Sequence, residues 1–160
     1  MRFLKRRLSD SIAALRDGYP AILVTGPRQS GKTTLAQEAF PDLPYVNFES
    51  PIERADFEQD PTGFLSRFPD GAILDEIQYV PEALSYLQVR IDAEGRTGRW
   101  ALTGSQQMEL SRQAAQSLTS RTTLLELLPF SRQELVGSPT CARTLAEAAV
   151  DLHILTGFQR

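Results

Sequence analysis

Eight consecutive residues have the spacing of a loop that binds phosphate groups. They read Gly26-Pro27-Arg28-Gln29-Ser30-Gly31-Lys32-Thr33 and match the pattern GxxxxGK[ST] in full. Glycines let such a backbone curl so that successive N–H groups point at phosphate oxygens, and the following helix adds the positive end of its dipole. In this pattern the Lys32 ammonium reaches the β- and γ-phosphates, and the Thr33 hydroxyl takes one position on Mg²⁺. We therefore expect residues 26–34, with Thr34 included, to bind a nucleoside triphosphate and its magnesium ion.

An acidic pair, Asp75-Glu76, follows the short apolar segment 71–74. On its own such a pair indicates little, because strands commonly end at polar residues. Beside a phosphate-binding loop, however, the carboxyl end of a parallel strand places Asp75 next to the phosphates. Asp75 would then bind Mg²⁺ directly or through water, and Glu76 would orient or deprotonate an attacking water. An adjacent Asp and Glu favour hydrolysis over transfer to a bound small molecule.

Two hydroxyl residues and one arginine are further candidates. Thr103 and Ser105 follow the apolar segment 100–102, so either hydroxyl could bond the γ-phosphate or the attacking water. An ordinary Thr-Gly-Ser turn is the alternative interpretation. Arg121 precedes the last expected strand and could stabilise transition-state charge in its own subunit or in a neighbour's. A surface arginine before a strand is the alternative there.

Short branched apolar segments alternate with helical ones along most of the chain. Strands are predicted at residues 21–25, 45–48, 71–74, 100–102 and 122–127. Helices are predicted at residues 33–40, at 51–67 in two pieces broken at Pro61 and Gly63, at 81–95, and through Met108, Leu110 and Leu118. This alternation predicts an α/β fold with a mainly parallel five-stranded sheet flanked by helices.

The two ends of the chain depart from this alternation. Basic residues crowd the first sixteen positions, and apolar residues recur at 4, 8 and 12, which predicts a basic amphipathic helix within residues 1–17. That helix would be a solvated element on the core, a contact for nucleic acid, or a targeting segment. After Phe130 we expect a short helical turn at 131–135 and a helix at 142–155, with Leu145, Ala149 and Leu152 on one stripe. This stripe is expected to be exposed, folded back or used for association.

Length and composition limit the class of protein. The chain has 160 residues, of which 41% are hydrophobic and 23% charged, values that suit one globular domain. A net charge of -3 gives no overall attraction to nucleic acid or to an anionic membrane. One cysteine, Cys141, and one histidine, His153, exclude a disulfide within the chain and a Cys/His zinc site. A reducing, cytoplasmic compartment is the expectation for a chain with a single cysteine. No apolar run approaches the roughly 18 residues that span a bilayer, so no membrane partner is expected.

Four segments together resemble a known family. Residues 22–34, 73–78, 102–105 and 128–131, the last followed by Glu134-Leu135, are similar to prokaryotic AAA-type ATPases that pair an AAA domain with a C-terminal domain of unknown function. The resemblance covers residues 1–135 and implies a P-loop NTPase fold of the AAA+ kind, with Asp75 on magnesium, Glu76 as catalytic carboxylate and Ser105 as sensor. Family members often have a glycine before the arginine that precedes the last strand, where this chain has Ser120. The resemblance also implies that residues 136–160 are a linker and a helical stub of a missing C-terminal domain.

The leading functional prediction is magnesium-dependent ATP binding and hydrolysis that couples nucleotide state to an attached domain or partner. ATP rather than GTP follows from the resemblance, and the chain has no Asn-Lys-x-Asp motif for guanine. The alternatives are a nucleotide-binding module without productive turnover and a small P-loop kinase. Nucleic acid or protein is a possible partner through the missing domain, and a homo-oligomer is possible because arginines in such ATPases often act across subunits.

Overall fold

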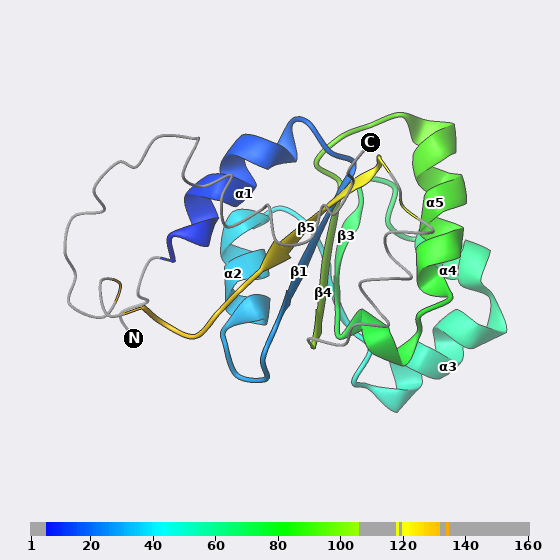
Figure 1. The fold of residues 1–160 in the computed structure, drawn as a ribbon. Helices are drawn as coiled ribbons and strands as arrows, with labels where there is room; N and C mark the ends of the chain where they lie inside the picture. The colour runs from blue at the N-terminus through cyan, green and yellow to red at the C-terminus, as the bar shows by residue number, and fades with distance from the viewer. Residues whose placement is uncertain (1–5, 106–117, 119, 132–133, 135–160) are drawn as a thin grey trace, which may run out of the picture.

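A five-stranded parallel sheet forms the centre of the fold. A computed structural model describes residues 6–105, 118, 120–131 and 134 of the chain. Its strands are β1 (Ala21–Gly26), β2 (Tyr45–Asn47), β3 (Ala72–Asp75), β4 (Trp100–Ser105) and β5 (Thr122–Glu126). They lie in the order β2-β3-β4-β1-β5, and every adjacent pair is parallel (Figure 1). The predicted α/β fold with a parallel five-stranded sheet is confirmed.

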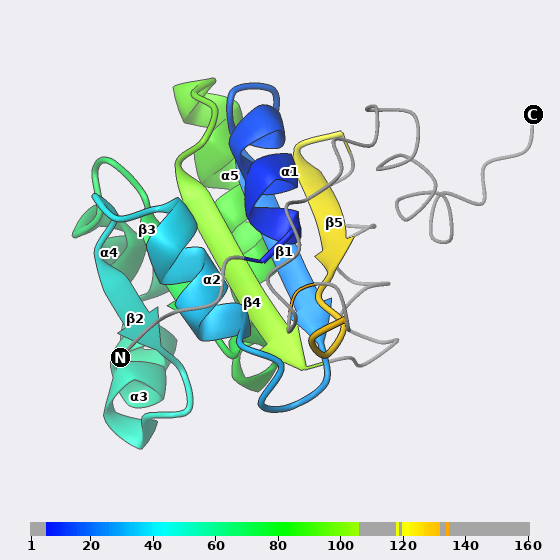
Figure 2. The same ribbon diagram turned by 90° about the vertical axis from the view of Figure 1, so that its left-hand side faces the viewer.

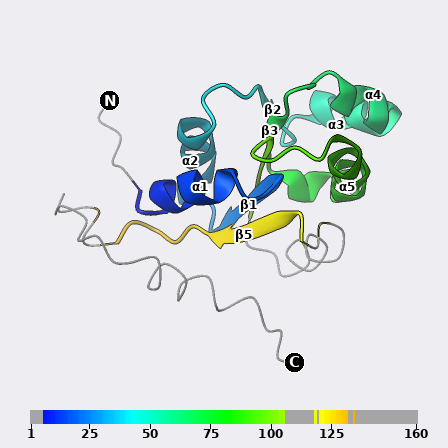
Figure 3. The same cartoon turned by 90° about the horizontal axis from the view of Figure 1, so that it is seen from above.

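Helices cover both faces of this sheet. Those of the described residues are α1 (Leu8–Arg16), α2 (Lys32–Ala39), α3 (Pro51–Gln59), α4 (Pro61–Ser66) and α5 (Ala83–Glu94), with a 3₁₀ turn η1 (Ile77–Tyr79) after β3. Helices α1 and α2 lie on one face and α3, α4 and α5 on the other (Figure 1, Figure 3). Parallel strands are joined by such crossover helices because each chain reversal must span the length of a strand.

Two hydrophobic cores result, one on each side of the sheet. From β1, Ile22 and Val24 pack with Leu35 and Phe40 of the α2 region. The alternate residues of β1, Ala21 and Leu23, pack toward α3, α4 and α5 together with buried aromatic side chains. Because successive side chains of a strand point to opposite faces, a strand covered on both sides must be apolar throughout. This requirement explains why all six residues of β1 are buried.

Side-chain caps determine where α3 and α4 begin. The Ser50 hydroxyl accepts the Glu53 N–H at the start of α3, with Pro51 as first helical residue. The Asp60 carboxylate accepts the Gly63 N–H at 2.9 Å at the start of α4. The predicted division of 51–67 into two helical pieces is confirmed, with the break at Asp60, next to Pro61, and with Gly63 inside α4. Proline is favoured in the first turn because its missing N–H needs no partner there.

Two further predictions differ from the structure, and two others fall mainly on residues that it does not describe. Residues 103–105 were expected in a turn, but they extend β4, because β1 continues beside them and Gly26 pairs with Ser105. The amino-terminal helix begins at Leu8, and Arg6 precedes it as a buried side chain rather than lying on a solvated face. Of the helix expected through residue 118, only Leu118 itself is described, and it is buried. The expected helix at 142–155, like the whole of 136–160, lies outside the described residues.

Because the strands are parallel, their carboxyl ends meet at one edge of the sheet. Figure 2 shows the arrowheads of β1, β4 and β5 pointing the same way. The register places Asn47 beside Asp75, and Gly26 beside Ser105. The residues that follow β1, β3 and β4 therefore meet at this carboxyl edge, where ligands of open parallel sheets bind.

Candidate active site

The loop between β1 and α2 has the conformation that its glycines predict. Gly26 has φ 150° and Gly31 has φ 91°, both in a region that side chains disfavour. A Cβ on Gly26 would lie 2.2 Å from the Leu127 carbonyl oxygen, so no side chain fits at this position. Gly31 caps the amino end of α2, whose first residue is Lys32. Residues 26–31 thus form a tight turn that ends on the positive pole of a helix.

Lys32 is held inside this loop. Its side chain is buried, and its ammonium donates to the carbonyl oxygens of Gly26 at 3.2 Å and of Pro27 at 2.9 Å. A buried cation is costly unless bonded, and carbonyls satisfy its protons without neutralising its charge. The loop therefore retains a positive charge that suits an anionic ligand. The Ser30 hydroxyl, also buried, has no hydrogen-bond partner among the described residues and is a further free donor.

Asp75, at the end of β3, collects three hydroxyl groups. The Thr33 hydroxyl donates to both carboxylate oxygens, at 3.1 and 2.9 Å, and so connects the first turn of α2 to the acidic pair. The Tyr45 hydroxyl donates to Asp75 Oδ2 at 2.7 Å, and Thr103 on β4 donates to Oδ1. Four elements thus supply one cluster of oxygen atoms, buried at Asp75 and Thr103 and open at Tyr45, and oxygen atoms are the donors that Mg²⁺ prefers.

The Tyr45 phenol stays protonated in this cluster. Partial burial, the hydrogen bond to Asp75 and the negative charges of Asp75, Glu76 and Glu49 all raise the pKa of Tyr45 above its ordinary value. The phenol is therefore a fixed donor to the carboxylate at neutral pH. Tyr45 was not anticipated, because it lies on a separate short strand and its role depends on the pairing of β2 with β3.

Glu76 is held away from Asp75 by its backbone and by a glutamine. Its φ of 57° is left-handed, and its N–H donates to the Thr103 hydroxyl at 3.2 Å. The Glu76 carboxylate accepts a bond from the Gln78 side-chain amide, and Gln78 in turn accepts the Ser105 N–H at 3.3 Å. Gln78 therefore links the acidic pair to the end of β4. Sequence reasoning used Gln78 only as part of a resemblance and assigned it no contact.

Backbone strain gathers at this edge. Among the described residues, three side-chain-bearing positions have positive φ: Gln29 in the loop, Glu76 after β3, and Ser120 before β5. Such conformations cost free energy and often mark functional sites. Two of the three belong to the candidate site, and the third lies at the opposite edge of the sheet.

Arg121 is not at this site. Its carbonyl accepts the N–H of Ala21, the first residue of β1, so Arg121 lies at the amino edge of the sheet. Its guanidinium pairs there with Asp92 of α5, with one N–O distance of 3.0 Å. The expectation that Arg121 serves the phosphates of its own subunit is therefore wrong, since a residue before a parallel strand lies opposite the strand's carboxyl end. A role across subunits stays a prediction.

The other predicted residues are placed together. Residues 26–34, Asp75, Glu76 and Ser105 meet at the carboxyl edge, as do the unanticipated Tyr45 and Gln78. Arg28 and Gln29 lie in the loop and Thr34 lies in the first turn of α2, so all three are at this edge through their place in the chain. Glu76 is half-buried, whereas Asp75 is buried, which leaves Glu76 the better placed of the two to meet water.

Comparison with known proteins identifies the class. Residues 18–136 match a family of AAA domains. The chain belongs to this family. This AAA domain is 33% identical over 139 residues to uncharacterized protein Rv2008c of Mycobacterium tuberculosis and equally to uncharacterized protein Mb2031c of Mycobacterium bovis, matches that cover 84% of the chain. The chain spans only 31% of the length of these relatives.

Solved structures support the same fold. Domain III of the replication initiation protein DnaA from Thermotoga maritima has a TM-score of 0.54 at 17% identity, covering 82% of this chain and 67% of that one. A signal transduction ATPase with numerous domains from Pyrococcus horikoshii, which has a tetratricopeptide repeat sensor, has a TM-score of 0.50 at 14% identity, covering 84% and 24%. These likenesses confirm the P-loop NTPase fold of the AAA type, and family membership indicates nucleotide binding of the ATPase kind.

The described residues suit a magnesium ion that arrives with phosphates. They contain no group of three His, Cys, Asp or Glu side chains that could enclose a metal ion by themselves. One carboxylate, Asp75, and one hydroxyl, Thr33, lie together beside the loop, and Mg²⁺ is usually held by one or two carboxylates plus substrate phosphates. Among the same residues, no helix has the length and apolarity needed to cross a bilayer.

Proposed function

We propose that this AAA domain binds ATP with Mg²⁺ at residues 26–34 and hydrolyses it with Glu76 as the base. The observation that carries the proposal is the pair of bonds from Thr33 to Asp75, because they join the phosphate-binding loop to the acidic pair in one cluster. Separate motifs in a sequence could lie apart in space. Here the Thr33 hydroxyl lies within 3.1 Å of both Asp75 oxygens, and Lys32, the residue before Thr33, bonds the loop carbonyls.

In this proposal the loop N–H groups and the helix dipole bind the phosphates, and Lys32 exchanges a carbonyl contact for a phosphate oxygen. Thr33 and Asp75 would hold magnesium, which when bound neutralises charge on the phosphates. Tyr45 and Thr103 keep the Asp75 carboxylate oriented through their hydroxyl bonds. These residues would position the nucleotide, and such positioning supplies much of the rate enhancement in phosphoryl transfer.

Glu76 supports the chemical step. Its carboxylate accepts a proton from a water molecule as the water oxygen bonds the γ-phosphorus and the bond to the ADP oxygen breaks. Gln78 holds Glu76 through its amide, and Ser105, at the end of β4, is the proposed sensor of the γ-phosphate. Since the relatives are about three times longer than the match, we further propose that nucleotide state acts on a protein or nucleic-acid partner through a region beyond the AAA domain.

The proposal is tested by thermal unfolding with MgATP, MgGTP or no nucleotide. At 100 times Kd, MgATP should stabilise the wild-type chain by about 2.7 kcal/mol, or roughly 5–10 °C for this size. Lys32→Ala should lose this shift, because it removes the buried ammonium, whereas Arg96→Met, which removes an exposed cation at the opposite edge, should keep it. Phosphate release is measured on the same samples.

Each outcome is informative. No shift with MgATP in the wild-type chain would contradict nucleotide binding at this loop. A shift that Lys32→Ala preserves would place the nucleotide elsewhere. Stabilisation without phosphate release at any protein concentration would contradict hydrolysis and leave a nucleotide-binding module.

A further inference from the structure

Arg6 reaches the phosphate-binding loop from outside the known motif. Its Nη1 donates to the Ser30 carbonyl at 2.7 Å, and its Nη2 donates to the Leu128 carbonyl. Its Nε pairs with Glu134 Oε1 at 3.2 Å, and the guanidinium stacks 4.1 Å from the centre of the Phe130 ring. The side chain is only 7% exposed. Arg6 is therefore a buried cation whose bonds join the loop to the chain that follows β5.

Glu134 is held from several directions. Its Oε2 accepts the Ser131 N–H at 2.8 Å, and its own N–H donates to the Ser131 hydroxyl at 3.2 Å, the reciprocal pattern of a capping box. Its Oε1 accepts the Arg7 N–H at 3.0 Å as well as the Arg6 bond. Burial raises the pKa of Glu134, but the Ser131 and Arg7 bonds and the Arg6 charge outweigh it and lower the pKa below its usual value. The carboxylate is therefore ionised at neutral pH and orients Arg6.

The chain after β5 also touches the loop directly. The Leu127 N–H donates to the Thr25 carbonyl at 2.7 Å, and the Leu127 carbonyl fills the space where a side chain on Gly26 would lie. Residues 127–131 together with Glu134, which we name the exit segment, thus meet the loop at Gly26 and, through Arg6, at Ser30. A shift of the loop backbone on ligand binding must be accommodated by this segment.

We propose that Arg6 is a positioning residue for the phosphate-binding loop and that the Arg6–Glu134 pair couples nucleotide binding there to the placement of the exit segment. The inference deepens the proposed function and rests on it. Arg6 acts by fixing the Ser30 carbonyl, one residue before Gly31, so that the adjacent N–H groups keep their inward direction. Glu134 fixes Arg6, and the exit segment leads to whatever follows the ATPase core in the chain.

Thermodynamic reciprocity gives the proposal two measurable sides. If the pair helps hold the loop in its binding conformation, breaking it must weaken nucleotide affinity. If nucleotide stabilises that conformation, it must in turn slow opening of the exit segment. A pair that merely adds stability would do neither, because its loss would lower the unfolding free energy without changing affinity in the folded protein.

Glu134→Gln is the main test variant, since it removes the charge and keeps the shape. Arg6→Lys keeps the charge and removes the fork of donors that binds two carbonyls at once. The matched control is Glu94→Gln, because Glu94 pairs at 2.8 Å with Arg90, which likewise binds backbone carbonyls but at the opposite edge of the sheet. MgATP affinity is measured by calorimetry, and backbone opening at residues 26–33 and 127–131 by hydrogen exchange.

We expect Glu134→Gln and Arg6→Lys each to weaken MgATP binding about tenfold, within the usual range of 5- to 150-fold for coupled sites. Without nucleotide, exchange at residues 26–33 should be faster in both variants, while α5 exchanges as in the wild type. In the wild type MgATP should slow exchange at 127–131, and in the variants this protection should be lost. Glu94→Gln should leave affinity and exchange at both segments unchanged.

Unchanged affinity and unchanged loop exchange in Glu134→Gln would overturn the inference. Normal affinity in Arg6→Lys would show that charge alone matters and would contradict the positioning role. If the wild-type chain bound no MgATP, the proposed function would fail by itself, and exchange without nucleotide would still show whether the pair holds the loop. The two proposals therefore fail in distinguishable ways.

Discussion

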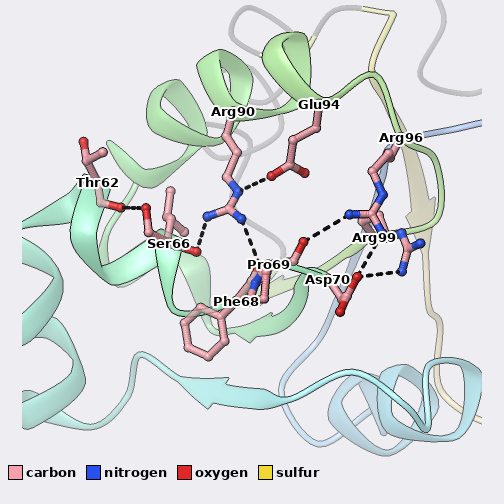
Figure 4. Close-up of polar contacts among 10 residues, drawn as sticks. Thr62, Ser66, Phe68, Pro69, Asp70, Arg90, Glu94, Arg96 and Arg99 are labelled. Atoms are coloured by element: carbon pink, nitrogen blue, oxygen red, sulfur yellow. Dashed lines mark hydrogen bonds and ion pairs between the residues drawn. The ribbon is translucent and has the colours of Figure 1, made fainter.

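Arg6 and Arg90 make nearly the same set of contacts in two regions of the molecule. Arg90 donates to the Leu65 and Phe68 carbonyls and pairs with Glu94 (Figure 4). Its guanidinium also lies 5.4 Å from the Trp100 ring centre. Arg6 likewise binds two carbonyls, a glutamate and an aromatic ring. The bonds alone therefore do not distinguish a structural arginine from a functional one.

What differs is the set of segments that each arginine joins. Arg90 connects α5 to the end of α4 and the turn before β3, all within one layer of helices at the amino edge of the sheet. Asp70, the exposed Arg96 and the half-buried Arg99 continue this network in the same region. Arg6 connects the first described residues, the phosphate-binding loop and the exit segment. The Arg90 contacts thus stay within one layer of helices, whereas the Arg6 contacts join the phosphate-binding loop to the exit segment.

The largest expected difference between the two regions is the effect on ATP turnover of replacing a glutamate. Glu76→Gln at the carboxyl edge should lower ATP turnover by roughly 10²–10⁴ while MgATP still binds, because an amide cannot accept the proton of the attacking water. Single-turnover phosphate release measures the effect, and calorimetry measures binding. Glu94→Gln at the amino edge should turn over ATP like the wild type. Wild-type turnover in Glu76→Gln would remove Glu76 from the mechanism.

The second largest expected effect is a loss of stability when a side chain at the amino edge is changed. Arg90→Met keeps the apolar stem but leaves two carbonyls and Glu94 without the guanidinium, so we expect the free energy of unfolding to fall by about 2–3 kcal/mol. Urea unfolding measures this loss, and the folded protein should bind MgATP with unchanged affinity. Arg96→Met, which breaks an exposed ion pair in the same network, should cost under about 1 kcal/mol. Equal losses for the two variants would contradict this account.

The smallest effect concerns the turn before β5. Ser120 has φ 65°, a conformation that costs an ordinary residue free energy and that glycine adopts freely. Ser120→Gly should therefore raise the free energy of unfolding by about 0.5–1 kcal/mol, or a few degrees in Tm, with no change in nucleotide affinity. The converse change, Gly95→Ala at φ 61° after α5, should lower stability by a similar amount. Destabilisation by Ser120→Gly would show that the serine side chain has a role of its own.

Much of the candidate site could be predicted because its chemistry is local in sequence. Eight contiguous residues define the loop, and Asp75 and Glu76 follow directly from a strand end. The parallel sheet then brings these segments together at one edge, a consequence of strand direction alone. The same reasoning, carried further, would have placed Arg121 at the opposite edge, because that residue precedes its strand.

The residues that were missed depend on contacts between distant segments. Arg6 lies 128 positions from Glu134, and its neighbours give it the charge pattern of a solvated basic helix. Tyr45 meets Asp75 only because β2 pairs with β3. One local signal was available: Ser131 and Glu134 have the spacing of a capping box, which marks Glu134 as a residue with a fixed carboxylate.

The position of β1 between β4 and β5 has a consequence for how the protein is made. When a growing chain has been synthesised only as far as Ser105, β1 can pair with β4 but still lacks its second neighbour. Two later contacts are also missing, because Leu127, whose carbonyl lies beside Gly26, and Glu134, which pairs with Arg6, have not yet been synthesised. The nascent chain therefore presents an unpaired apolar strand edge until β5 emerges, which ends about twenty residues after Ser105. Such an exposed edge invites chaperones or aggregation. The phosphate-binding loop would therefore be among the last parts of this domain to gain all its contacts.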